Sequence, residues 1–82
     1  MEAHLRLFLV YLNMKWRAVK AGGVLKALLR LGWRIKRQKG SHRILGKDGY
    51  PDFTFAFHDK EEIGPRMLAR IAKHTDLTPD AF

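Results

Sequence analysis

The apolar positions along the chain divide it into two helical stretches with an alternating region between them. In residues 21–32, AGGVLKALLRLG, apolar side chains recur at three- and four-residue intervals, and basic side chains take the other face. We expect this helix to begin near residue 22 or 23, because the Gly22-Gly23 pair is poor helix material. Gly32 is its natural end, since glycine tolerates the left-handed conformation of a C-terminal cap.

Beyond this helix the period changes to two, which is the spacing of strands with one buried face. In residues 33–38, WRIKRQ, Trp33 and Ile35 share a face, and the basic side chains between them take the other. Residues 39–41 turn the chain, and residues 42–45 form a second strand. Strict alternation places His42, the first residue of that strand, on the same face as the apolar Ile44.

A third strand follows a loop at residues 46–51, GKDGYP, in which two glycines and a proline mark a hairpin connection. In residues 52–58, DFTFAFH, the three phenylalanines Phe53, Phe55 and Phe57 fall on one face. This is the strongest core signal in the chain, because large aromatic side chains on one side of a strand need a covering layer.

A second helix is predicted from Pro65 onward, since proline suits a first helical turn, where its missing N–H costs nothing. Its inward stripe consists of apolar residues at helical spacing, namely Met67, Leu68, Ile71 and Ala72. At the end of the chain, Thr78 is placed to cap a last short turn, with Phe82 packing back.

The expected fold is therefore α+β, with the order α-β-β-β-α. Each element has one apolar face, so the natural packing lays both helices on one face of a three-stranded antiparallel sheet. The opposite face of the sheet is left open and basic.

The N-terminal segment stands apart from this domain. Residues 5–12, LRLFLVYL, are apolar apart from one arginine, yet a membrane span needs about 20 such residues. Met14 then reads as a fresh start. Two interpretations are open for residues 1–14: an upstream extension from a wrongly assigned start, or an apolar arm that packs on the domain or on a partner. Residues 15–82 form the domain itself.

Charge narrows the range of partners. The chain carries 16 Lys and Arg against 8 Asp and Glu, a formal net charge of +8. Eleven basic residues and no acid lie between residues 15 and 47. Such a one-sided field attracts polyanions, and nucleic acid is the leading candidate. A merely soluble basic surface is the alternative. The absence of cysteine excludes disulfides and thiolate metal sites and fits the cytoplasm.

His42 is the histidine whose neighbours suit chemistry on a phosphate. Gly40 lets the backbone approach a ligand, Ser41 adds a hydroxyl, and successive N–H groups in such a turn can bind an anion. Arg37, Lys39 and Arg43 supply positive charge, as does Lys36. Imidazole exchanges protons near neutral pH, and RNA carries its own nucleophile in the 2′-hydroxyl. By itself, however, the Gly-Ser-His tripeptide is weak evidence for catalysis, and on these grounds alone a phosphate-contacting or structural role for His42 is favoured over a catalytic one.

Other chemistries fit the residues less well. His58 ends the phenylalanine strand on the face opposite the core, as a surface residue or as a group beside the site. We expect no metal and no cofactor, because the histidines lack ligand spacing and the acids cluster elsewhere. A Ser41 nucleophile is disfavoured, since adjacent strand residues point to opposite faces. The orientation of His42 is open, because Ile44, on its own face by alternation, looks core-facing.

Together these stretches resemble the HicA toxins of bacterial and archaeal toxin–antitoxin systems. The likeness covers residues 15–82 and lies in the leucine-rich helix, the basic strand leading into Gly40-Ser41-His42, the strand closing in His58, and Gly64-Pro65 before the second helix. It implies a fold like that of double-stranded-RNA-binding domains, ribosome-independent mRNA cleavage with His42 as catalytic residue, and a HicB antitoxin as partner. The third strand departs from the family, which often ends it Pro-x-His.

Three hypotheses follow. In the first, the protein is a metal-independent endoribonuclease toxin in which His42 transfers protons and the basic residues hold the phosphate. In the second, the same basic face binds RNA without cutting it. In the third, that face meets an acidic protein partner.

Overall fold

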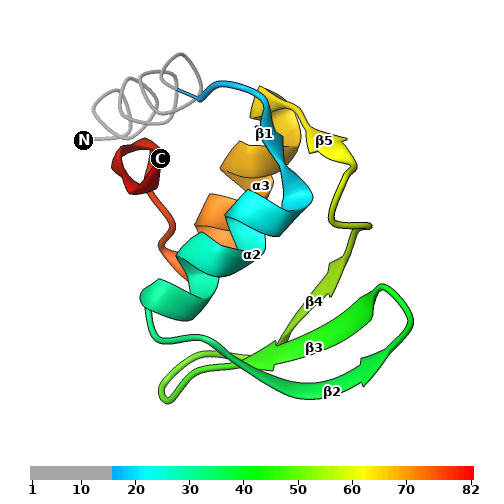
Figure 1. Ribbon diagram of the computed structural model, residues 1–82. Helices are drawn as coiled ribbons and strands as arrows, with labels where there is room; N and C mark the ends of the chain where they lie inside the picture. Colours follow the sequence, from blue (N-terminus) through cyan, green and yellow to red (C-terminus); the bar gives the residue numbers. More distant parts are fainter. Residues whose placement is uncertain (1–15) are drawn as a thin grey trace, which may run out of the picture.

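The structure, a computed structural model, describes residues 16–82 and confirms the expected order of helix, three strands and helix (Figure 1). The extension proposed for residues 1–14 lies outside the described residues. The elements in chain order are β1 (Val19–Lys20), α2 (Ala21–Arg30), β2 (Arg34–Lys39), β3 (His42–Gly46), β4 (Phe53–Ala56), β5 (Glu62–Ile63), α3 (Pro65–Thr75) and the 3-10 turn η1 (Pro79–Ala81).

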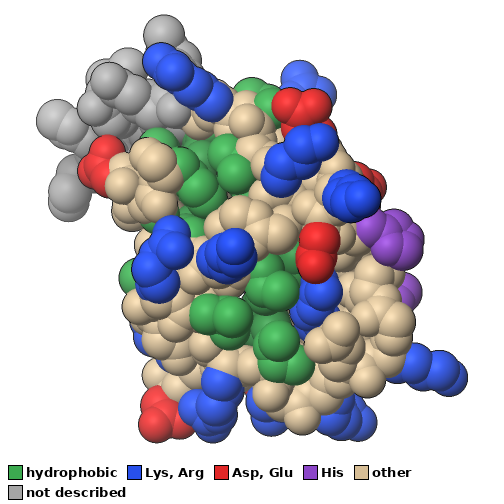
Figure 2. Space-filling model, viewed as in Figure 1, with side chains coloured by type: hydrophobic (Ala, Val, Ile, Leu, Met, Phe, Trp, Pro, Cys, Tyr) green, Lys and Arg blue, Asp and Glu red, His purple; other side chains and the backbone are tan. Residues whose placement is uncertain are grey.

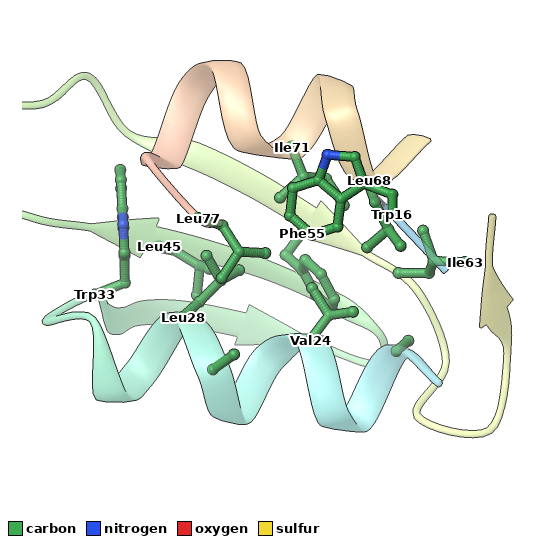
Figure 3. Packing of buried hydrophobic residues seen from close by; sticks show 12 residues of the cluster. Trp16, Val24, Leu28, Trp33, Leu45, Phe55, Ile63, Leu68, Ile71 and Leu77 are labelled. Atoms are coloured by element: carbon green, nitrogen blue, oxygen red, sulfur yellow. The ribbon is translucent and has the colours of Figure 1, made fainter. Parts of the chain in front are cut away.

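Strands β2, β3 and β4 form the predicted antiparallel meander, in that spatial order. Both helices lie on one face of this sheet, as expected. The fully buried Leu45 of β3 and Phe55 of β4 belong to one cluster with apolar side chains of α2 and α3 (Figure 3). Burial of a side chain of this size contributes about 1.5–3 kcal/mol, so these two positions fix which face of the sheet the helices cover.

The phenylalanine strand behaves as its alternation predicts. Phe55 is fully buried, while Phe53 and Phe57 are partly buried and pack against the same cluster. Phe57 meets Phe55 edge-on, with 5.1 Å between ring centroids, and Phe53 stacks on His74 of α3 at 5.7 Å. The strand therefore places one aromatic ring at the centre of the core and one on either side.

Helix α2 begins at Ala21, before the glycine pair expected to delay it. The N–H of Ala21 donates to the Glu61 carbonyl at 2.8 Å, and the N–H of Gly22 donates to the Asp59 carbonyl at 3.0 Å. These bonds satisfy donors that a helix N-terminus leaves unpaired, which stabilises the early start. The predicted end is confirmed, since Gly32 follows the helix with φ of 108°.

A second, two-stranded sheet joins β1 to β5, pairing Val19 with Ile63 and Lys20 with Glu62. The sequence does not predict this sheet, because two-residue strands carry no periodic signal and their partners lie far apart in the chain. This sheet ties the entrance of α2 to the entrance of α3. It thereby holds the N-terminal ends of the two helices together at one end of the domain.

The C-terminal end of α3 is tied to the start of β2. The indole Nε1 of Trp33 donates to the carbonyl of the buried Thr75 at 3.2 Å. Tyr50, in the loop before β4, meets Trp33 edge-on and donates its hydroxyl to Asp76. That hydrogen bond, with desolvation and the carboxylate charge, raises the pKa of the Tyr50 hydroxyl.

The last residues lie where they are expected, but the predicted capping hydrogen bond is absent. Thr78 occupies the N-cap of η1, although its side chain makes no capping hydrogen bond. Phe82 packs edge-on against Trp16, with ring centroids 6.3 Å apart, and is 49% exposed. Among residues 16–82, no helix has the length and apolar content needed to cross a bilayer.

The core assignment predicts different costs for one substitution at two positions. Ile71 of α3 is 1% exposed and Ile35 of β2 is 39% exposed. Ile71→Val should lower the free energy of unfolding by about 0.5–1.5 kcal/mol, because it leaves a methyl-sized void. Ile35→Val should stay within about 0.5 kcal/mol of the parent. Urea unfolding measures both, and equal losses would contradict the assignment.

Candidate functional site

Strands β2 and β3 are joined by a two-residue turn, Gly40-Ser41, between the paired residues Lys39 and His42. Gly40 has φ of 58°, as expected from the sequence, and Ser41 is not in the positive-φ region. Glycine at the first turn position is the pattern of a type II′ hairpin, whose twist matches that of the flanking strands. Gln38 braces this turn, since its side-chain amide donates to the Gly40 carbonyl at 3.1 Å.

His42 is exposed and lies on the open face of the sheet. It is the first residue of β3, directly across from Lys39 on one side and Ala56 on the other. Alternation places it on the face of Ile44, as expected, but that face is not the core. Arg43, Leu45 and Gly46 are the buried residues of this strand. The side chains of Arg43 and Leu45 point toward the helices and leave His42 in solvent.

A β-bulge in β2 brings two cations to the same face as His42. The register shifts between Ile35, which pairs with Leu45, and Arg37, which pairs with Ile44. Without the shift, strict alternation from Ile35 would turn Arg37 toward the helices. Because the bulge inserts one residue, Arg37 falls opposite Ile44, and Lys39 falls opposite His42.

These side chains line an open hollow on the sheet, with a volume of about 540 Å³. Its lining residues are Arg37, Gln38, Lys39, His42 and Ile44. Arg37 and Lys39 are exposed, and neither forms an ion pair with a residue in the 16–82 range. An anion lying in the hollow would meet a guanidinium, an ammonium and an imidazole, which is a set that can hold a phosphate and exchange a proton with it.

Two of the cations predicted to contact phosphate, Lys36 and Arg43, form ion pairs and do not line the hollow. Lys36 donates to both carboxylate oxygens of Asp52, at 2.8 and 3.0 Å, and does not line the hollow. Exposed pairs of this kind are worth only about 0.2–1 kcal/mol, so Lys36 is weakly held. Arg43 lies on the helix-facing side of the sheet, 9% exposed, and pairs with Asp59 at 3.0 Å. The expected phosphate-contacting set thus divides between the two faces.

His58 follows β4 and is exposed. Its N–H donates to the Glu61 carboxylate at 3.2 Å, and its carbonyl accepts the Glu61 N–H at 2.9 Å. Figure 2 shows histidine side chains gathered at one margin of the molecule, on the side of the β2–β3 turn. Across residues 16–82, no three His, Asp or Glu side chains gather as a metal site would require.

Two residues of the hollow, Gln38 and Ile44, are not predicted from the sequence. The apolar side chain of Ile44 predicts a core position, and nothing in the sequence marks its face as the open one. Gln38 carries no signal beyond its place before a turn. Both belong to the hollow only because strand pairing brings β2 and β3 together.

The turn itself yields a prediction about stability. Gly40→Ala should lower the free energy of unfolding by about 1–2 kcal/mol, because a Cβ disfavours positive φ. No clash contributes, since a Cβ at this position would meet no atom within 4 Å. Ser41→Ala, one residue further along the same turn, is the matched control and should be nearly neutral. Urea unfolding compares them, and equal effects would refute the backbone explanation.

Comparison with known proteins identifies the family to which the chain belongs. A family model described as HicA toxin of bacterial toxin-antitoxin matches residues 23–77, well over half of the chain. No curated protein and no solved structure matches the chain. The matched span runs from the first turn of α2 to just beyond α3, and it contains the β2–β3 turn, the hollow and His42. The chain therefore belongs to the HicA toxin family.

Proposed function

We propose that the protein is a metal-independent endoribonuclease that cleaves mRNA, with His42 as its catalytic residue. Membership of the HicA family makes it the toxin of a toxin–antitoxin system. The observation that carries the proposal is the exposed His42 imidazole, which lines the same hollow as Arg37 and Lys39. A proton-transfer group and two free cations then meet one phosphodiester.

The chemistry requires little from the protein, because RNA supplies its own nucleophile. His42 takes the proton of a 2′-hydroxyl, and the 2′-oxygen attacks the adjacent phosphorus. The bond to the 5′-oxygen breaks, and that oxygen must receive a proton as it leaves. The products are a 2′,3′-cyclic phosphate and a 5′-hydroxyl. No water or metal ion is needed as a reactant in this step.

Arg37 and Lys39 hold the phosphate and stabilise the charge that develops on its oxygens. Their freedom from ion pairs within residues 16–82 supports this role, since no carboxylate has to be displaced first. The backbone N–H groups of Gly40 and Ser41 add donors at the turn. Lys36 contributes long-range attraction, because its charge is partly offset by Asp52.

A toxin of this family acts with an antitoxin. We assign that role to a HicB-like protein that binds over the hollow and keeps RNA away from His42. The site of action is the cytoplasm, where mRNA is found. Expression with and without the antitoxin would then switch growth arrest off and on.

Replacement of His42 tests the catalytic assignment. His42→Ala should slow cleavage of an RNA oligonucleotide by about 100-fold or more, the usual contribution of a positioned acid–base group. The fold should be unaffected, since the side chain is exposed and contributes nothing to the core. Rates are read from cleavage products on a gel, and growth arrest on expression should disappear in parallel.

His74→Ala is the control, because His74 lies on α3 against Phe53 and outside the hollow. It should cut RNA at the parent rate, and EDTA should leave the parent rate unchanged. If His42→Ala cuts as fast as the parent, the catalytic assignment is wrong. If the parent binds RNA but yields no products, a non-catalytic RNA-binding module is the better description.

Salt dependence tests the phosphate contacts. In a His42→Ala background, which prevents cleavage, the logarithm of the RNA-binding constant should fall linearly with the logarithm of salt concentration. Arg37→Met and Lys39→Met should each reduce that slope by about 0.7, the value for one contact on a single strand. Fluorescence anisotropy with a labelled RNA measures it.

Lys26→Met is the charge-matched control for this experiment, because Lys26 is exposed on α2 and does not line the hollow. It should change the slope less than either hollow variant. Equal changes at all three positions would mean that RNA senses only the overall charge, and the hollow would not be the binding site.

A further inference from the structure

Arg43 follows His42 in β3 but points the opposite way, toward the helices, and is 9% exposed. Within residues 16–82 it is the one charged residue that the fold buries. Burial of a guanidinium is unfavourable unless its partners are supplied, and an apolar residue would fill the space without that cost. The contacts of Arg43 therefore indicate what its charge does there.

The guanidinium spans the two residues that flank His58. Its Nη1 donates to the Phe57 carbonyl at 3.3 Å, and its Nη2 donates to the Asp59 carboxylate at 3.0 Å. The planar guanidinium holds these acceptors in fixed relative positions, which a lysine ammonium would not do. Arg43, a residue of the same strand as His42, thus binds the main chain of Phe57 just before His58 and the side chain of Asp59 just after it.

Further hydrogen bonds hold the rest of this segment. Glu61 exchanges two hydrogen bonds with the His58 backbone, through its carboxylate and its N–H. The Asp59 carbonyl accepts the N–H of Gly22 at the start of α2. These contacts replace strand pairing, because β4 ends at Ala56 and the sheet supplies no ladder bonds beyond it.

The strand pairing and the chemistry of RNA cleavage both relate His58 to His42. Ala56, the strand partner of His42, lies two residues before His58. Because Ala56 pairs with the first residue after the β2–β3 turn, the chain leaves β4 toward His58 at the turn end of the sheet. Phosphodiester cleavage moves two protons, one from the 2′-hydroxyl and one to the leaving 5′-oxygen, so a second proton-transfer group near His42 would have a role.

Building on the proposed function, we infer that Arg43 is a positioning residue that holds His58 at the His42 end of the open face. His42 takes the 2′-hydroxyl proton as the bond from the 2′-oxygen to phosphorus forms. Protonated His58 gives its proton to the 5′-oxygen as the bond from phosphorus to that oxygen breaks. Arg43 touches neither the RNA nor the reacting atoms and acts from the far side of the sheet.

A double-mutant cycle tests this role. Single-turnover cleavage is measured for the parent, Arg43→Met, His58→Asn and the double variant. Arg43→Met should slow cleavage about 10- to 100-fold, the usual effect of a misplaced catalytic group. The double variant should lose no more than His58→Asn alone, since Arg43 acts through His58. Losses that multiply would overturn the inference.

Salt dependence separates positioning from phosphate contact. In the His42→Ala background, Arg43→Met should leave the salt slope of RNA binding unchanged, whereas Lys39→Met lowers it. A decrease of about 0.7 for Arg43→Met would identify a phosphate contact instead and overturn the inference.

Asp59→Asn removes the same ion pair from its solvent side and keeps the test open if Arg43→Met does not fold. The Asp59 side chain is 63% exposed, so the fold should tolerate this change. It should slow cleavage in the same direction as Arg43→Met but by less. An Asp59→Asn protein that cuts at the parent rate would contradict the positioning of His58 by Arg43.

An NMR measurement is independent of activity and thus separates failure of this inference from failure of the proposed function. The imidazole signals of His58 should move in Arg43→Met and Asp59→Asn, while those of His74 stay in place. If the parent cuts no RNA but these signals move, the nuclease proposal fails and the positioning holds. If the His58 signals do not move in either variant, Arg43 does not position His58.

Discussion

The packing of Leu45 and Phe55 against both helices determines the rest of the structure. Side chains of a strand alternate, so burial of these two residues sends their neighbours His42, Ile44 and Ala56 to the opposite face. Because both helices occupy one side, nothing among residues 16–82 covers the other. The exposed face that carries His42 is therefore a direct consequence of how the core is filled.

Charge on that face depends on two irregularities in the hairpin. The bulge in β2 changes the direction of Arg37 and Lys39, and the tight turn at Gly40 returns the chain so that His42 pairs with Lys39. Strand β2 lies at the edge of the sheet, where a bulge disturbs no further neighbour. A regular β2 would turn Arg37 and Lys39 toward the helices.

Much of the fold could be read from the sequence because its signals are local. The helical spacing before Gly32, the alternating phenylalanines and Pro65 each reflect a requirement of one element. The pairing of β1 with β5 could not be anticipated, since it joins two short segments more than forty residues apart. The early start of α2 depends on that same distant contact, through the carbonyls of Asp59 and Glu61.

For the site, the sequence by itself determined the residue types: a histidine after Gly-Ser, cations around it, and no acid between residues 15 and 47. The tertiary structure decided which of them meet. Arg37 and Lys39 join His42, Lys36 pairs with Asp52, and Arg43 turns inward to Asp59. Composition and spacing are properties of one segment, whereas the direction of a strand side chain depends on what the opposite face buries and where the register shifts.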